Sequence, residues 1–212
     1  MTRMTSAQPA VHNPDAAGDT GQPPLTVQLR PVLELDDEQF FAIAQLNRNV
    51  RLERGPGGEL IVMPPTGGET SDQNAEIAMQ LRLWAKRDGT GTTFDSSAGF
   101  RLPNGAIRSP DAAWVSHPRL AALTPEQWQR FLPLCPDFVI ELRSRTDSLV
   151  AAQNKLAEYI ANGARLGWLL DAPAKRVYIY RPDAPVQEVD NPDTLTGDPV
   201  LPGFVLDLRE VW

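Results

Sequence analysis

The sequence predicts one α/β domain with a mixed sheet, because helical and strand-like segments alternate along most of its length. The clearest helix covers residues 69–89 (ETSDQNAEIAMQLRLWAKRDG), where Ile77, Leu81 and Trp84 form one apolar stripe. The clearest strand is DFVIEL, residues 137–142, a continuous apolar run typical of the middle of a covered sheet. A chain of 212 residues is long enough for one such domain with a sizeable core.

The N-terminal part begins with a segment that lacks any periodicity. Residues 1–26 are rich in Ala, Pro, Gly, Thr and Asp, so we expect a disordered tail and a folded domain from residue 27 to 212. Residues 35–47 (LDDEQFFAIAQLN) predict a helix with acidic residues in its first turn, where the helix dipole favours them. Residues 50–65 (VRLERGPGGELIVMPP) predict a hairpin around a Gly-Pro-Gly-Gly turn. In the helix that follows, Thr70 and Gln73 can form a capping box, and Gly89 ends it.

The second half of the chain continues the alternation. Residues 92–102 and 107–115 predict two strands joined by a Pro-Asn-Gly turn, and residues 116–136 predict a loop with one helical turn from Pro125. A second amphipathic helix is expected within residues 147–163, capped by Asp147 or Ser148 and ended by Gly163. Residues 165–182 then predict a strand, a turn and a strand. The 137–142 strand, this helix and the next strand form a plausible right-handed βαβ unit.

Composition narrows the class of protein. With 42% hydrophobic and 22% charged residues the chain resembles an ordinary soluble protein, and it has no apolar run that could span a bilayer. The N-terminus lacks the apolar region of a secretory signal. One cysteine, Cys135, suits a reducing cytoplasm and is expected to be a small packed hydrophobe. We therefore expect a cytoplasmic protein with no membrane partner.

The formal net charge of −7 disfavours a nucleic-acid partner only at first sight. Residues 182–212 carry a net charge of −6 and residues 1–26 a net charge of −1, so residues 27–181 are neutral. The acidity lies mainly in the C-terminal segment, and the central region can still present a local basic groove. The charge pattern thus permits a phosphate-bearing partner without implying one.

Two predicted strands each carry a carboxylate where an apolar residue would cost less. Asp111 follows Pro110, which cannot donate a ladder hydrogen bond, and Glu141 follows three apolar residues. If the strands are neighbours, both carboxylates can converge on Mg²⁺, which takes one or two protein carboxylates, several waters and substrate phosphate. Such an ion polarises a phosphodiester and lowers the pKa of bound water.

Two further residues can complete this site. Lys155 lies at the edge of the apolar stripe of its helix, where it can either extend to solvent or reach toward Glu141. In the second case it would position and activate the attacking water and offset transition-state charge. Glu69, near the start of the first long helix, can point into the same cleft, or it can simply favour the helix N-terminus.

These residues belong to a set of segments that resembles a known family. The segments are Pro110-Asp111, ELR at 141–143, SRTDSL at 144–149, KLAEYIANGARLGWLLD at 155–171, PPTGGET at 64–70 and DPVLPGFVLDLREVW at 198–212. Together they resemble the putative restriction endonuclease family of the PD-(D/E)XK nuclease superfamily. The resemblance implies a core of helix, three strands, helix and strand, with an added N-terminal helix and hairpin. It also implies metal ligation by Asp111 and Glu141.

The sequence departs from the superfamily pattern at position 143, where arginine replaces the lysine of the motif. Arginine stays protonated and is a poor proton acceptor, so it cannot replace that lysine directly. In this family the lysine is expected on the following helix, which here means Lys155. Arg143, together with Arg101, Arg108 and Arg145, can instead form a phosphate-binding rim, although solvated charged faces are commoner.

Three functions remain open at this point. The first is a Mg²⁺- or Mn²⁺-dependent endonuclease that hydrolyses phosphodiester bonds in DNA, as a possible homodimer. The second is a nuclease-like fold without turnover that acts as a binding or assembly module, with Glu141 paired to Arg143 or Lys155. The third is a metal-dependent hydrolase of another phosphate ester.

Overall fold

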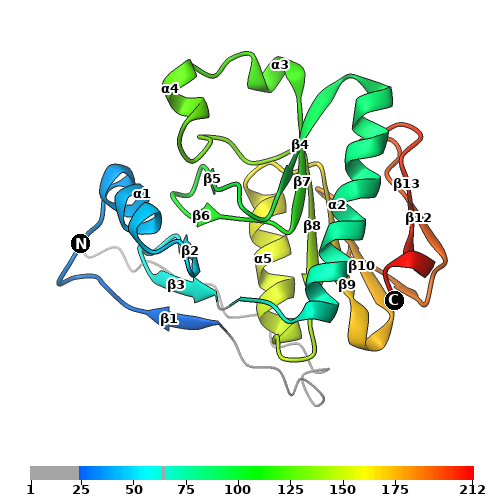
Figure 1. Ribbon diagram of the computed structural model, residues 1–212, viewed down its shortest axis with the longest axis horizontal. Coiled ribbons are helices and arrows are strands. Elements are labelled where there is room, and N and C mark those ends of the chain that lie inside the picture. The colour runs from blue at the N-terminus through cyan, green and yellow to red at the C-terminus, as the bar shows by residue number, and fades with distance from the viewer. Residues whose placement is uncertain (1–23, 64) are drawn as a thin grey trace, which may run out of the picture.

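The computed structural model describes residues 24–63 and 65–212 (Figure 1). Most of the predicted disordered tail, residues 1–26, lies outside the described residues. The first strand, β1 (Leu25–Val27), pairs antiparallel with β3 (Leu60–Met63). Strand pairing therefore begins two residues before the expected domain boundary at residue 27.

The central element is a six-stranded sheet in which one strand pair is parallel. Its strands run in the order β11-β10-β9-β8-β7-β4, and only β8 and β9 are parallel neighbours in it. Helix α5 (Leu149–Ala161) connects these two, so the expected βαβ unit is present. The predicted mixed α/β fold is confirmed. The bounds are β4 (Gly91–Asp95), β7 (Ala112–Ser116), β8 (Phe138–Arg143), β9 (Leu166–Asp171), β10 (Arg176–Tyr180) and β11 (Gln187–Asp190).

The two faces of this sheet are covered by different helices (Figure 1). Helix α2 (Gly68–Asp88) covers one face together with the C-terminal segment, and α5 covers the other. Side chains of a strand alternate between faces, so Phe138, Ile140 and Leu142 of β8 pack under α2. Val139 packs under α5, and the same alternation sends Glu141 to that side. The C-terminal segment comprises β12 (Thr194–Thr196), β13 (Val205–Asp207) and the 3₁₀ helix η3 (Leu208–Glu210).

A second sheet of five strands lies beside the α5 face, in the order β1-β3-β2-β6-β5. The predicted hairpin of residues 50–65 forms its β2 (Arg51–Arg54) and β3. Helix α1 (Asp37–Leu46) contributes Phe40 to the core of this sheet, where it lies with Leu52 and Ile107. This sheet brings the hairpin next to the loop that precedes β7.

Two predicted strands are each divided between the two sheets. Residues 92–102 form β4 and β5 (Phe100–Arg101), and residues 107–115 form β6 (Ile107–Arg108) and β7. The prediction of single strands was therefore wrong. The break in the second case falls at Ser109–Asp111, where Pro110 has no N–H for a ladder. The break releases Asp111 from regular pairing at the point where the chain passes from one sheet to the other.

Helix ends follow the predictions in part. Helix α2 starts at Gly68 with Gly67 as its N-cap, so the predicted Thr70–Gln73 capping box is wrong, but Gly89 ends the helix with a φ of 72° as expected. Ser148 caps α5 by accepting a hydrogen bond from the amide of Ala151.

Residues 116–136 contain the expected helical turn, α4 (Pro125–Trp128), and one that was missed, α3 (His117–Leu120). A 3₁₀ turn, η2 (Ala172–Ala174), joins β9 to β10. In the described part of the chain, none of the helices combines the length and the apolar composition that a membrane span requires.

Candidate active site

The two predicted metal ligands lie next to each other where β7 begins. The register pairs Ala112 of β7 with Ile140 of β8, so Asp111 and Glu141 occupy the adjoining positions of the two strands. Both residues are buried. The Asp111 carboxylate accepts a hydrogen bond of 2.9 Å from the amide of Leu142, which fixes one of its oxygens against the backbone of β8. The two carboxylates therefore share one small region on the α5 face.

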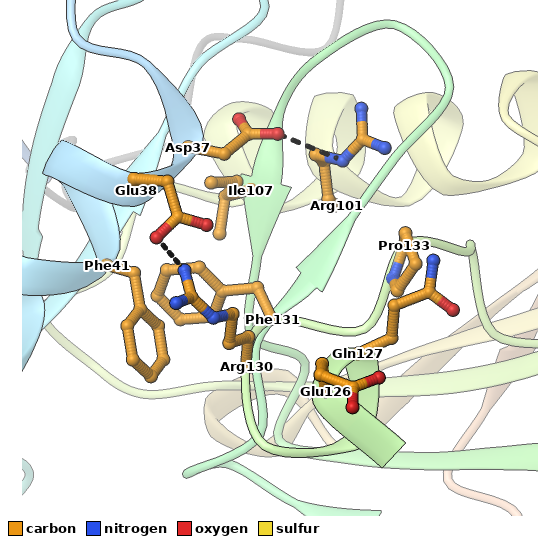
Figure 2. A pocket seen from close by; sticks show the side chains of 10 residues that line it. All are labelled: Asp37, Glu38, Phe41, Arg101, Ile107, Glu126, Gln127, Arg130, Phe131 and Pro133. Atoms are coloured by element: carbon orange, nitrogen blue, oxygen red, sulfur yellow. Dashed lines mark ion pairs between the residues drawn. The ribbon is translucent and has the colours of Figure 1, made fainter. Parts of the chain in front are cut away.

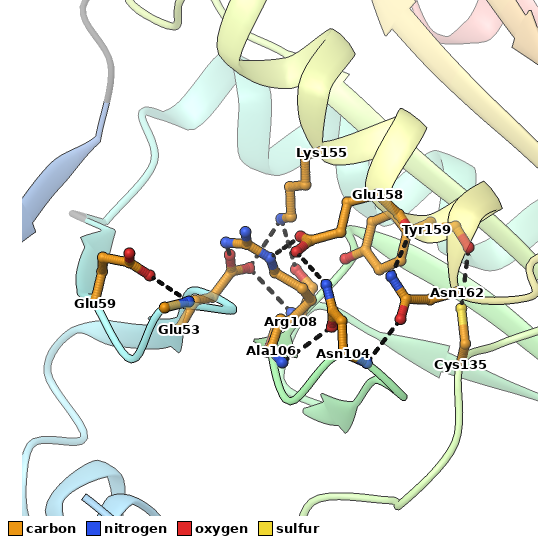
Figure 3. A network of polar contacts seen from close by, with 12 residues as sticks. Glu53, Glu59, Asn104, Ala106, Arg108, Cys135, Lys155, Glu158, Tyr159 and Asn162 are labelled. Atoms are coloured by element: carbon orange, nitrogen blue, oxygen red, sulfur yellow. Dashed lines mark hydrogen bonds and ion pairs between the residues drawn. The ribbon is translucent and has the colours of Figure 1, made fainter. Parts of the chain in front are cut away.

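The side chain of Lys155, on α5, points toward Glu53 of β2 and not to solvent (Figure 3). Its Nζ lies 2.9 Å from Oε1 of Glu141 and 2.8 Å from Oε1 of Glu53, and it donates to the carbonyl of Ser109 at 3.3 Å. Of the two orientations open at the sequence level, the structure has the one directed at Glu141. Tyr159, one helical turn further along, donates to the same Glu141 oxygen at 3.1 Å.

Glu53 of β2 is a site residue that the sequence reasoning missed. It is almost fully buried and accepts hydrogen bonds from Lys155, from the amide of Ser109 at 3.0 Å, and from Arg108 at 3.2 Å. A sequence signal existed, because RLER places three charged residues in a four-residue strand where β-favouring apolar residues are usual. That pattern does not say which distant residues the charges meet.

Arg108 extends the network from Glu53 of β2 to Glu158 of α5 (Figure 3). Its Nε lies 2.6 Å from Glu158 of α5, and Glu158 also accepts from the side chain of Asn104 at 2.9 Å. Together with Glu53, Glu158 gives Arg108 two carboxylate partners. The predicted phosphate-binding arginine is thus already paired inside the protein.

Burial and charge move the pKa values of these groups in opposite directions. Burial raises the pKa of Glu141 to about 7, and Asp111 and Glu53 add to that rise, while Lys155 opposes it. Burial also acts to raise the pKa of Glu53, but Lys155 and Arg108 outweigh it and hold that pKa at about 2. Burial acts to lower the pKa of Lys155, but Glu141 and Glu53 outweigh it, so the pKa is raised. Lys155 is therefore a charged ammonium at neutral pH.

The other predicted residues lie at different places. Arg143 is buried and contacts Asp171 at 2.7 Å and the carbonyl of Asp147 at 2.9 Å. Arg145 is exposed in the turn after β8. Glu69 is exposed in the first turn of α2 and, within the described residues, makes no hydrogen bond or ion pair with Asp111, Glu141 or Lys155.

Two other features are separate from the carboxylate region. Cys135 is buried, its thiol donates to the carbonyl of Tyr159, and burial raises its pKa to about 12, which agrees with a packed role.

A cavity of about 380 Å³ lies between α1 and the loop around α4 (Figure 2). Phe41, Phe131 and Arg101 line it, with ion pairs Asp37–Arg101 and Glu38–Arg130 at its rim. Asp111, Glu141 and Lys155 are not among its lining residues.

Comparison with known proteins identifies the family. The family model described as "Putative restriction endonuclease" (Uma2) matches residues 37–209. The chain belongs to this family. A similar solved structure is titled as a putative nuclease belonging to DUF820 from Anabaena variabilis, with a TM-score of 0.64 and 21% sequence identity. The match covers 76% of this chain and 88% of that one, and at this identity it shows a shared fold. Among curated proteins, none matches the chain.

The carboxylates of this Uma2 domain fit a small metal site. In the described part of the chain there is no group of three or more His, Cys, Asp or Glu residues that could hold a metal ion. Mg²⁺ needs only one or two protein carboxylates, because waters and substrate phosphate complete its shell. Asp111 and Glu141 supply such a pair, and both are hard oxygen donors. The donor set is thus compatible with Mg²⁺ or Mn²⁺.

Proposed function

We propose that this chain is a magnesium-dependent endonuclease that hydrolyses phosphodiester bonds in DNA. One observation carries the proposal. Asp111 and Glu141 adjoin each other on neighbouring strands, with the Lys155 ammonium 2.9 Å from Glu141, in a chain of the putative restriction endonuclease family. A carboxylate pair with an adjacent cation combines metal ligands with a group that moves protons and offsets charge.

Asp111 and Glu141 would hold Mg²⁺, with Mn²⁺ as the alternative ion. When bound, the ion supplies Lewis-acid polarisation of the phosphodiester and a water of lowered pKa. Cation binding requires both carboxylates to be ionised, and the raised pKa of Glu141 means that this group holds a proton part of the time near neutral pH. Cation affinity should therefore rise with pH across that range.

Lys155 is proposed as a general acid and charge-stabilising group, because its ammonium is protonated at neutral pH. Its contacts with Glu53 and Glu141 keep the ammonium within the site, where it donates hydrogen bonds and stabilises negative charge that develops on phosphate oxygens. Of the predicted rim arginines, Arg145 is exposed and lies in the turn directly after β8, so it is the one that we propose to meet phosphate. Arg108 and Arg143 already have carboxylate partners. We therefore assign Arg108 to holding the site together, and Arg143 to joining the ends of β8 and β9 through Asp171. Glu69 stays a candidate for a further site residue on α2.

A second candidate function is a binding or assembly module without turnover. It is favoured by the pairing of the site itself, because Asp111 contacts Arg51, and Glu53 and Glu141 both contact Lys155. A charge network that is neutralised internally is one that a fold can retain without any cation. The nuclease and the module without turnover therefore make opposite predictions for the binding of a divalent cation.

The test joins cation binding with cleavage. Calorimetry with MgCl₂ and MnCl₂ should show one site that is lost in Asp111→Asn, because an amide oxygen is a weaker ligand for a hard cation. Circular and linear DNA should be cut by the wild type in the presence of the cation and stay intact in its absence. No cleavage of any DNA despite cation binding would favour another phosphate ester as substrate, and neither binding nor cleavage would favour the module.

We place the enzyme in the cytoplasm, in line with its one cysteine, Cys135. A homodimer is proposed on the ground that a two-fold axis would present two sites to the two strands of a duplex. Sedimentation of the protein with and without a DNA duplex tests the dimer.

A further inference from the structure

Strand β2 directs a second charged residue at the site, and the inference drawn from it rests on the proposed function. Nη1 of Arg51 lies 3.2 Å from Oδ1 of Asp111. Its side chain is 25% exposed, whereas those of Lys155 and Arg108 are each 13% exposed. Arg51 is thus the most solvent-accessible of these three cations, and it is paired with one of the two proposed metal ligands.

The contacts of Asp111 divide between its two oxygens. Oδ2 accepts from the amide of Leu142, and Oδ1 faces Arg51. A divalent cation at Asp111 must therefore compete with the guanidinium for the side of the carboxylate that Arg51 now occupies. Arginine remains protonated at all relevant pH values, so Arg51 can yield this position only by moving and not by losing a proton.

The guanidinium has capacity for a second partner. Its contact with Asp111 uses Nη1, and within the described residues Nε and Nη2 of Arg51 make no hydrogen bond. An arginine fork with free donors matches the oxygens of a phosphate group well. Burial acts to lower the pKa of Arg51, but Asp111, Glu53 and Glu141 outweigh it, which shows that the side chain lies in the field of all three carboxylates.

We propose that Arg51 exchanges partners during the reaction cycle. Before a divalent cation binds, it neutralises Asp111; once the cation occupies Asp111, it moves to a phosphate of the DNA backbone beside the site. Arg51 is then an internal competitor of the metal and a substrate-binding residue. The two carboxylates stay neutralised in both states, and the guanidinium never remains unpaired beside the bound cation.

The first test measures cation affinity without any turnover. Calorimetric titration with MgCl₂ should give roughly 5-fold or more tighter binding to Arg51→Gln than to the wild type, the lower end of ordinary coupling between two binding events. Arg51→Lys keeps the charge and should bind the cation close to the wild-type level. Arg48→Gln is the matched control, because it removes an exposed arginine three residues away whose hydrogen bonds are to Gln45. Arg51→Met replaces the Gln variant if that variant does not fold.

The second test measures the salt dependence of DNA affinity with a short duplex. It is done in the Lys155→Gln background, which lacks the proposed acid–base group. With saturating MgCl₂, Arg51→Gln should flatten the slope of log affinity against log salt by about 0.9, the value for one lost phosphate contact. Without the cation the slope should not change, since Arg51 is then held by Asp111.

The outcomes separate this inference from the proposed function. Equal or weaker cation binding by Arg51→Gln, or tightening of the same size in Arg48→Gln, overturns the competition. Tighter cation binding with an unchanged salt slope overturns the exchange to phosphate. Both failures leave cleavage by the wild type standing, whereas a wild type that binds no cation overturns the inference and the proposed function together.

Discussion

The two faces of the central sheet are built in opposite ways. Under α2 and the C-terminal segment, Phe138, Trp168 and Phe204 form an aromatic cluster, with the rings of Trp168 and Phe204 stacked 5.8 Å apart. Under α5, Leu156 and Tyr159 pack against the sheet. On the same face Lys155 contacts Glu141 and also Glu53 of β2, so this face carries buried charges as well as apolar side chains.

Strand β8 contributes to both faces, with apolar residues on one side and a charged residue on the other. Consecutive residues of β8 serve the two faces in turn, so Ile140 and Leu142 stabilise one face while Glu141 carries charge on the other. Buried ion pairs often stabilise no more than well-packed apolar residues of the same size, because the charges must be desolvated. A fold that keeps several of them on one face, when the opposite face shows apolar packing, is best explained by a use for the charges.

The largest expected effect lies on the charged face. Lys155→Ala should lower turnover by about 100- to 10,000-fold, the usual result of removing one positioned acid–base group. Cation binding should remain, because Asp111 and Glu141 are unchanged. Cleavage rates and calorimetry of the same preparation measure both quantities. Lys86→Ala, at an exposed position of α2, is the control. Cleavage by Lys155→Ala at the wild-type rate would contradict the proposed mechanism.

On the apolar face the effect should be on stability alone. Phe204 is buried against Trp168, Trp84 and Phe138. Phe204→Ala should lower the free energy of unfolding by about 3–5 kcal/mol through lost burial and a residual cavity. Denaturant unfolding measures it. Turnover per folded molecule should stay at the wild-type level well below the transition. A selective loss of turnover in the folded protein would mean that the two faces are coupled.

The smallest effect concerns Glu53, which joins the hairpin to the charged face. Its folded pKa of about 2 lies below its usual value of 4.5, so the unfolded chain takes up this proton first as the pH falls. Its contribution is present above pH 4.5, is lost as the pH falls toward 2, and amounts to about 3 kcal/mol when complete. The difference in unfolding free energy between the wild type and Glu53→Gln should shrink over that interval.

The control for this titration is Glu59→Gln, on the same hairpin but outside the network around Lys155. Its difference from the wild type should not change in the same way with pH. A difference for Glu53→Gln that stays constant from pH 7 to pH 3 would mean that Glu53 is not paired with Lys155 and Arg108 in solution.

The main helices and strands, and three residues of the candidate site, were predictable from the sequence. Helices α2 and α5 and strand β8 were predictable because the spacing of their apolar residues indicates which side chains are buried. That spacing can be seen within a short stretch of sequence. Asp111 and Glu141 stood out as carboxylates beside apolar runs, and the family resemblance pointed to Lys155. The orientation of Lys155 was left open, because an edge position on a helix permits two directions.

Which distant residues contact these three could not be predicted from the sequence, because it depends on the packing of the two sheets. Glu53 is 102 positions before Lys155, and Arg51 is 60 positions before Asp111, and both arrive because β2 belongs to a second sheet beside the α5 face. The division of residues 107–115 between β6 and β7 was equally hidden, although Pro110 marked the place. Local periodicity reports that a side chain is buried, whereas its partner depends on how two sheets pack, which is set by contacts across the whole chain.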